Sequence, residues 1–226
     1  FEIGFNTMFM YTWRDREAVM DMLESITGNR VTTEYSQIGG VRRDIPPNLA
    51  DRLLKTMNVV EERTKYYIRV ALTERTIAKR TQGVGYLSPE EAKATCAVGP
   101  VLRASGVKND IRADDPYAAH ADVPFNVITY DTCDVFARVV VRAQELLECV
   151  NMIRTAIRNL PEGPFRVKLP MKPNAGEALT RVEAPRGELF HYTLSEGSLK
   201  PYRYKVRTPT LANLGALRAM LTSKGR

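Results

Sequence analysis

The sequence is short of the residues that build most recognisable active sites. Its 226 residues include three cysteines, two histidines and one tryptophan. No two cysteines are separated by only two residues, so no zinc ribbon, iron–sulfur motif or redox dithiol is present. With so few histidines and no HExxH motif, a self-contained zinc hydrolase is not expected. The GxxxxGKS/T, GxGxxG and GxSxG patterns are absent as well, which excludes the nucleotide-binding and hydrolase classes that they mark.

Long apolar runs are also missing. No stretch approaches the roughly 18 consecutive apolar residues that a membrane-spanning helix needs, so we expect the chain itself to be soluble. Hydrophobic residues make up 44% of the sequence and charged residues 26%. This balance excludes collagen-like, low-complexity and disordered chains.

Basic residues exceed acidic ones, but they do not cluster. Lys and Arg total 33 against 26 Asp and Glu, a formal net charge of +7. No Lys/Arg run is longer than two, whereas nucleic-acid-binding modules gather their basic residues, so nucleic acid is not expected as a partner. Cys96, Cys133 and Cys149 are widely spaced and no signal peptide is visible. We therefore expect a reducing, intracellular setting in which the cysteines are small core side chains.

The spacing of apolar residues predicts mainly helix in the first 160 residues. Apolar residues recur at intervals of three and four over residues 6–26, 46–81 and 132–160, and Gly28 is placed to end the first of these helices. Ser88 to Glu91 forms a capping box at the start of a shorter helix. Residues 30–38 are rich in β-branched and aromatic side chains, which favours a strand.

The spacing of apolar residues changes from a helical to a strand-like pattern after residue 160. Short strands are expected at residues 165–169, 179–183, 189–194 and 202–206, and a last helix at residues 208–221. Helices, then a small sheet, then a helix predict an α+β protein with a central long-helix bundle and a small antiparallel sheet. We expect one domain over residues 1–226, with a helical part to about residue 160 and a small β-rich part with the final helix after it.

Three polar segments stand out from this pattern. In residues 38–46 (IGGVRRDIP), the glycines permit a tight turn or a close backbone approach. Three charged residues, Arg42, Arg43 and Asp44, follow them and are called the charged elbow below. Residues 105–117 (SGVKNDIRADDPY) form a polar loop. In residues 181–189 (RVEAPRGEL), Pro185 fixes the backbone and Arg186 projects at a turn.

Together with the tail at residues 197–210 (GSLKPYRYKVRTPT), these segments resemble, in order, the large subunit of nickel–iron hydrogenases and the related quinone-site subunit of respiratory complex I. The resemblance covers essentially the whole chain. The details at residues 9–14, 27–30, 40–44 and 212–213 look most like energy-converting, membrane-bound, ferredoxin-linked hydrogenases. The complex I subunit more usually lacks the double arginine after Gly-Gly-Val.

The resemblance implies a catalytic subunit that evolves H₂ from protons with ferredoxin-derived electrons, coupled to ion translocation. The implied partners are an iron–sulfur small subunit, membrane ion-translocating subunits and a ferredoxin-type donor. The implied location is the cytoplasmic face of the cell membrane, as a peripheral subunit. The implied cofactors are a nickel–iron centre in the parent enzyme and an iron–sulfur cluster in the partner subunit.

In this family four cysteine thiolates hold nickel and iron, from a CxxC near each end of the subunit. The chain has neither motif, and Cys96, Cys133 and Cys149 do not match the ligand positions. We expect the two pairs to lie before Phe1 and beyond Arg226. No residue of this chain is therefore nominated as a metal ligand, and the fragment alone should be inactive.

The resemblance implies site residues in the outer shell of such a centre. Arg186 matches the arginine over the open side of the metal site, and Pro185 its neighbour at the iron's diatomic ligands; both are candidate catalytic residues. Because a guanidinium rarely loses its proton, electrostatic support during H₂ cleavage is favoured over a role as base. In the alternative, purely structural interpretation, Arg186 pairs with a nearby carboxylate.

The first polar segment supplies two further candidate groups. Gly39 and Gly40 are expected near the cofactor site or a subunit interface. Arg42, Arg43 and Asp44 are expected at the contact with the iron–sulfur subunit or the membrane arm.

Two other functions stay open at this point. A complex I-like parent would place a quinone head-group in the same cavity, without nickel. A non-catalytic scaffold would have kept the fold and lost the metal. Nucleic-acid binding is the remaining alternative that the basic composition allows.

Overall fold

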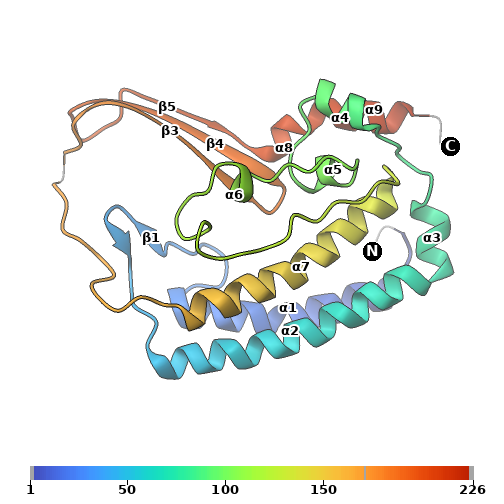
Figure 1. Cartoon of the computed structure of the whole chain (residues 1–226), viewed down its shortest axis with the longest axis horizontal. Helices are drawn as coiled ribbons and strands as arrows, with labels where there is room; N and C mark the ends of the chain where they lie inside the picture. Colours follow the sequence, from blue (N-terminus) through green and yellow to red (C-terminus); the bar gives the residue numbers. More distant parts are fainter. Residues whose placement is uncertain (1–2, 171, 224–226) are drawn as a thin grey trace. The chain divides into compact units, whose positions relative to one another are not determined.

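The computed structural model describes residues 3–170 and 172–223. Within them the chain combines α-helices with a two-stranded and a three-stranded antiparallel sheet (Figure 1). The predicted α+β class is confirmed. No helix of the described residues is both long enough and apolar enough to cross a bilayer.

The chain divides into two compact units. The first is made of Phe1–Val70 and Leu146–Pro170, and the second of Ala71–Glu145 and Met171–Arg226. Two of the three boundaries fall inside the two longest helices, α2 (Pro47–Thr73) and α7 (Val135–Arg158), and the third follows Pro170. Whether the two units amount to the single predicted domain stays a prediction.

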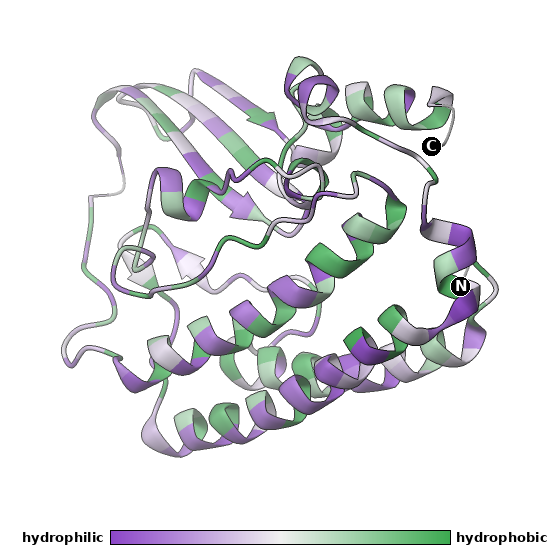
Figure 2. Ribbon diagram, turned by 45° about the vertical axis from the view of Figure 1, so that its right-hand side comes forward, coloured by the Kyte–Doolittle hydropathy of each residue, from purple (hydrophilic) through white to green (hydrophobic). Residues whose placement is uncertain are grey.

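The first unit contains α1 (Asn6–Thr27) and parts of α2 and α7. As predicted, α1 ends at Gly28, whose left-handed φ of 81° lets its N–H bond to the carbonyl of Glu24 at 2.7 Å. The Tyr67 hydroxyl on α2 donates to the carboxylate of Asp15 on α1. Arg154 joins α7 to α2 through Glu61 at 2.5 Å. Figure 2 shows hydrophobic and hydrophilic residues alternating along α2 and α7, as expected of helices with one packed face.

The predicted strand at residues 30–38 is wrong over most of its length. Only β1 (Ser36–Gln37) is extended, and it pairs with β2 (Gly40–Val41). Arg30 instead reaches back to three acidic side chains of α1, among them Asp21 at 2.6 Å and Glu24 at 2.8 Å. These ion pairs fold the segment against the helix.

The strand expected at residues 165–169 is also wrong, because the structure has a single bridge between Arg166 and Gly40. The segment nevertheless runs beside the β1–β2 turn. Val41 donates to the Phe165 carbonyl at 3.1 Å, and Val167 donates to the Gly39 carbonyl at 2.9 Å.

Two of the long helices are shorter than predicted. The helix expected over residues 46–81 breaks at Glu74 into α2 and α3 (Arg75–Thr81), because Glu74 is extended, with a ψ of 115°. The capping prediction is confirmed at α4 (Pro89–Ala94), where the Ser88 hydroxyl accepts from the Glu91 N–H at 3.1 Å. Helix α7 begins three residues late because the Asp134 carboxylate caps it, accepting from Ala137 N–H at 2.8 Å.

The main sheet lies in the second unit and has the order β3–β4–β5. Its strands are β3 (Ala175–Ala184), β4 (Gly187–Glu196) and β5 (Arg203–Arg207), so the predicted strands are present and two of them are longer than expected. The last helix is interrupted at Asn213, which separates α8 (Pro209–Ala212) from α9 (Leu214–Thr222).

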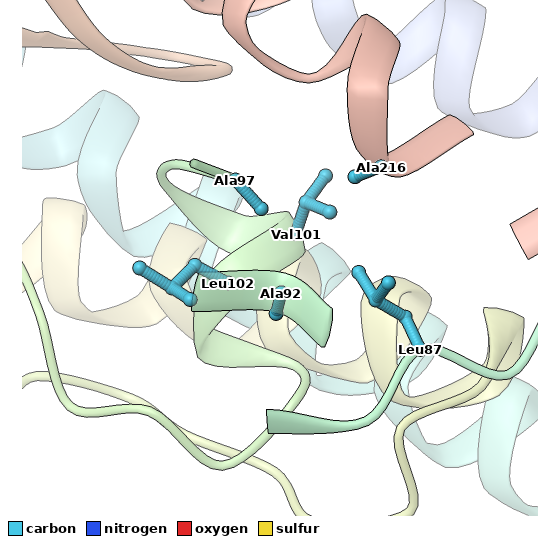
Figure 3. Close-up of a cluster of buried hydrophobic side chains, with 6 residues drawn as sticks. All are labelled: Leu87, Ala92, Ala97, Val101, Leu102 and Ala216. Carbon is cyan, nitrogen blue, oxygen red and sulfur yellow. The ribbon is translucent and has the colours of Figure 1, made fainter. Parts of the chain in front are cut away.

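The core of the second unit surrounds α4, α5 (Pro100–Arg103) and α9. Small and branched side chains fill it: Leu87, Ala92, Ala97, Val101, Leu102 and Ala216 (Figure 3). A second cluster joins the end of α5 to α7 through Ala104, Ala137 and Val141. This packing holds the short helices on which the candidate site depends.

The cysteines differ in their surroundings. Cys133 is buried and Cys149 is half-buried, whereas Cys96 is exposed, with a φ of 54°. The prediction of a core position is therefore confirmed for Cys133 and wrong for Cys96.

Candidate functional site

The candidate site is the turn between β3 and β4. These strands pair along their whole length, and the final pair, Ala184 with Gly187, leaves only Pro185 and Arg186 in the loop. Proline fixes φ near about −65°, which suits the first loop position. Gly187 supplies a φ of 124°. Pro185 and Arg186 are both exposed, so the turn projects them as the sequence predicts.

A close backbone contact fixes the place of this turn. Gly99 directly precedes α5, and a Cβ added to it would lie 2.3 Å from the Cα of Gly187. A Cβ on Gly187 would lie 2.8 Å from the Gly99 nitrogen. Side chains are excluded from both positions, so the two glycines let the hairpin meet the start of α5 backbone to backbone.

Asn213 ties the same two segments together from the α8–α9 junction. Its side-chain carbonyl accepts from the Val98 N–H at 2.9 Å. Its amide nitrogen lies 3.4 Å from the carbonyl oxygens of both Val98 and Arg186. The backbone of Arg186 is therefore held by a residue that is distant in sequence.

Beneath the turn lies a buried charge network centred on Arg103. The Arg103 residue is 1% exposed. Its guanidinium contacts Glu145 at 2.7 Å, Glu183 at 2.8 Å and Asp110 at 3.3 Å. Because Glu183 lies on β3 two residues before Pro185, this network joins the hairpin to α5 and α7.

The loop at residues 105–117 completes the network. Asp110 is 1% exposed and accepts from the side chain of Arg112 at 2.7 and 2.9 Å. The Tyr117 hydroxyl accepts from the Glu183 N–H at 3.0 Å. Arg181 on β3 pairs with Asp115 at 2.5 Å. The polar loop thus supports one edge of the hairpin.

Burial and pairing act against each other on the pKa values here. Burial alone would lower the pKa of Arg103, but attraction to Glu145 and Glu183 outweighs it and the pKa is raised. Burial would raise the pKa of Asp110, but Arg112 and Arg103 lower it. For Glu183 burial prevails over Arg103, and its pKa is raised.

Sequence reasoning missed this network. The segment that supplies Asp110 reads as a polar loop, and the other carboxylates lie 42 and 80 residues from Arg103 along the chain. One local signal was present, because Asp110 caps α6 (Ile111–Asp114).

The guanidinium of Arg186 differs from that of Arg103. Within residues 3–170 and 172–223 it forms neither a hydrogen bond nor an ion pair, while its backbone carbonyl is held by Asn213. The carboxylate pairing that a purely structural role would require is therefore not found in this part of the chain. The side chain is a positive charge on a fixed backbone, open to a ligand.

Gly39 lies in the turn between β1 and β2, and Gly40 begins β2, both in the first unit. A Cβ on Gly39 would lie 2.5 Å from the Val167 carbonyl, and one on Gly40 would lie 2.3 Å from the Phe165 carbonyl. The glycines thus serve the close backbone approach that the sequence indicated. Their place near a cofactor stays a prediction.

Arg42, Arg43 and Asp44 follow this turn and are all exposed. Among the described residues none of the three forms a salt bridge. The backbone here is fixed, because the Tyr35 hydroxyl donates to the Arg43 carbonyl at 2.7 Å. The predicted interface role stays a prediction.

The described residues contain no group of three or more His, Cys, Asp or Glu side chains arranged to hold a metal ion. The donor set does not fit a nickel–iron centre, which needs several thiolates, whereas the three cysteines are dispersed in sequence and in burial. No reaction step is therefore assigned to such a centre in this chain.

Comparison with known proteins identifies relatives along almost the whole chain. The sequence model of the family described as "Respiratory-chain NADH dehydrogenase, 49 Kd subunit" matches residues 2–172 and 167–225. A subunit of the NADH-quinone oxidoreductase of Rhizobium etli (strain CIAT 652) is 37% identical over 96% of the chain and 60% of the relative. A subunit of the F(420)H(2) dehydrogenase of Methanosarcina mazei is 40% identical over 95% of the chain and 60% of the relative.

Among solved structures, a chain of the membrane-bound sulfane sulfur reductase, an archaeal respiratory membrane complex, matches with a TM-score of 0.86 and 30% identity. The match covers 98% of this chain and 66% of that one. The chain spans 60% of the length of the curated relatives given above.

Proposed function

The chain belongs to the family of the 49 kDa subunit of respiratory-chain NADH dehydrogenase, and we propose that it passes electrons to a quinone-type acceptor at the Pro185–Arg186 turn. The predicted relationship to the complex I subunit is confirmed. Members of this family are subunits of oxidoreductase complexes, whereas the quinone-type acceptor is our proposal. It is supported by a relative named as part of an NADH-quinone oxidoreductase.

The observation that carries the proposal is the unpaired guanidinium of Arg186 on a backbone fixed by Gly99 and Asn213. A quinone takes up two electrons and two protons to become a quinol. Negative charge develops on its carbonyl oxygens as the electrons arrive, and a preorganised cation stabilises that charge. Because arginine keeps its proton, it orients and stabilises the acceptor, and the protons come from solvent.

We extend the proposal to the assembly. The subunit receives electrons from an iron–sulfur partner subunit and works beside membrane ion-translocating subunits, on the cytoplasmic face of the membrane. Support comes from the family description and from the similarity to a respiratory membrane complex.

A second candidate is the hydrogenase reaction, with ferredoxin as donor and a nickel–iron centre. The Arg42–Arg43 pair favours it, because this part of the sequence resembles the hydrogenase branch. Nickel analysis of the native complex separates hydrogenase from the other two functions: about one nickel per complex selects hydrogenase, and none leaves the quinone reaction and the non-catalytic scaffold, which binding of a quinone analogue then separates.

The test replaces Arg186 in the intact complex. Arg186→Gln should reduce kcat for quinone reduction by about 10²- to 10³-fold, the usual cost of one preorganised donor. Arg186→Lys should recover part of the loss, since it keeps the charge and lacks the planar fork. Arg203→Gln, at an exposed arginine on β5, is the matched control and should retain full activity. Equal rates in all three would show that Arg186 takes no part in quinone reduction and would contradict the proposal.

A further inference from the structure

Arg138 on α7 is a buried cation that forms no salt bridge with any described carboxylate, although the charge of Asp134 attracts it from one helical turn away. The residue is 7% exposed, and its Nη2 donates to the Gly85 carbonyl at 2.6 Å. Its Nη1 is buried and has no hydrogen-bond partner among the described residues, which include no carboxylate in salt-bridge range. Leaving a buried charged donor unsatisfied is costly, so an unpaired atom here calls for an explanation.

Arg142 lies one helical turn further along the same face of α7 and adds a second positive charge. Its Nη1 donates to the Arg138 carbonyl at 2.9 Å. Like charges four residues apart on a helix repel each other. Consistent with this, burial and the charge of Arg142 lower the pKa of Arg138, against the attraction of Asp134 and Cys133. Arg142 is exposed by surface area, but partial desolvation of its guanidinium and repulsion by Arg186 and Arg103 lower its pKa, against the attraction of Glu145.

The carboxylate that attracts Arg142 is already engaged. Glu145 accepts from the Nε of Arg103 at 2.7 Å and forms no salt bridge with Arg142 among the described residues. Arg103 shows how this unit neutralises a buried arginine when the purpose is structural, with three carboxylates around one guanidinium. The described part of the chain provides no such set for Arg138, Arg142 and Arg186.

We propose that Arg138 and Arg142, with Arg186 at the neighbouring turn, form a binding site for an oxyanion such as phosphate, sulfate or a carboxylate group. Guanidinium groups bind such anions through paired N–H···O bonds. The anion supplies both the acceptor that Arg138 lacks and the negative charge that offsets the repulsion. The site shares Arg186 with the proposed reaction, but it requires no electron transfer.

The test measures arginine reactivity in the full-length protein, purified with whatever subunits accompany it. Phenylglyoxal modifies accessible arginines, and mass spectrometry reports the rate at each position. Inorganic phosphate is titrated at constant ionic strength. We expect saturable protection of Arg142 and Arg186, with rates falling severalfold. Arg203 is exposed and unpaired among the described residues, so it is the internal reference and should react at an unchanged rate.

Two variants assign the protection to the cluster. Arg142→Gln, at an exposed position, should abolish phosphate protection of Arg186. Arg138→Lys keeps a cation but loses the fork, and should weaken phosphate binding severalfold as read at Arg142. Circular dichroism checks that each variant is folded, and the wild-type titration decides the question if Arg138→Lys is not.

Absence of protection, or equal protection of Arg203, would overturn the proposal, and so would Arg186 protection that survives Arg142→Gln. Because the readout is chemical protection and not turnover, a negative result leaves the proposed quinone reaction standing. A loss of quinone reduction in Arg186→Gln would likewise leave the anion site to be judged by this titration.

Discussion

Arg103 and Arg186 show how one unit uses the same side chain in opposite ways. Arg103 is buried among three carboxylates, and Arg186 is exposed and unpaired within the described residues. The sequence predicts the exposure of Arg186, because a flanking proline and glycine mark a tight turn. It could not predict the burial of Arg103, because the contacts depend on segments brought together by the fold.

Replacing Arg103 should therefore destabilise the protein strongly. Arg103→Met leaves buried carboxylates without a counter-ion, a change that typically costs about 3–5 kcal/mol of unfolding free energy. The control is Arg181→Met on β3, which removes a solvent-exposed pair with Asp115 and should cost less than about 1 kcal/mol. Denaturant unfolding measures both. Similar losses in the two variants would refute the central role of the network.

Tyr67 offers a titration test in the first unit. Burial and the hydrogen bond to Asp15 raise its pKa to about 12. A raised pKa favours the folded state while the phenol is protonated, so this contribution is lost as pH rises from about 10 towards 12. Isotope-labelled tyrosine NMR should show Asp15→Asn lowering the pKa of Tyr67 toward its ordinary value. An unchanged pKa would mean that Asp15 does not bond to it.

At the scale of elements, the hairpin turn depends on two glycines that meet. Gly99→Ala would place a methyl carbon 2.3 Å from the Cα of Gly187, at a φ of 64° that side chains rarely adopt. We expect a loss of about 1–3 kcal/mol in unfolding free energy, together with reduced activity because the Arg186 turn shifts.

Gly215→Ala in α9 is the matched control. Its added carbon would meet the Thr95 carbonyl at 3.4 Å, an ordinary contact, and alanine favours helix. Stability should stay the same or rise. If Gly99→Ala behaved in the same way, the close contact between the hairpin and α5 would not exist in solution.

Element prediction succeeded where local signals were strong. The spacing of apolar residues in α1 and the glycine after it predicted the ends of that helix to within about one residue. The break at Glu74 had no glycine or proline to announce it, and β-branched residues around Val31 indicated a strand that ion pairs of Arg30 prevent. Tertiary contacts decided both cases.

At the scale of the whole molecule, the exposed elbow at Arg42, Arg43 and Asp44 bears on assembly. Reversing the charge of Arg42 and Arg43 together should weaken association with the proposed partner, an iron–sulfur subunit or the membrane arm, seen as lost co-purification and stronger salt sensitivity. Lys168→Glu with Lys172→Glu makes the same change in net charge at exposed positions and should have no effect. Unchanged co-purification of the variant with Arg42 and Arg43 reversed would show that these residues do not form a subunit interface.

The family could be identified from ordered motifs in the sequence, whereas the branch could not. The Gly-Gly-Val and Ala-Pro-Arg-Gly-Glu turns indicate the superfamily, whereas the Arg42–Arg43 pair favours the hydrogenase branch, which stays a prediction. The structure adds the fixed Arg186 turn and, on α7, Arg138 and Arg142, which form no salt bridge among the described residues. Both features depend on contacts that no sequence pattern reveals.

Photolabelling of the native complex tests directly whether a quinone binds at the Arg186 turn. A photoreactive quinone analogue is activated in the complex, and labelled peptides are mapped by mass spectrometry. We expect labels at residues 184–187 and 98–99, competed away by excess quinone and lost in Arg186→Gln. Labels confined to other segments, or unaffected by that substitution, would contradict the assignment of quinone reduction to the Arg186 turn.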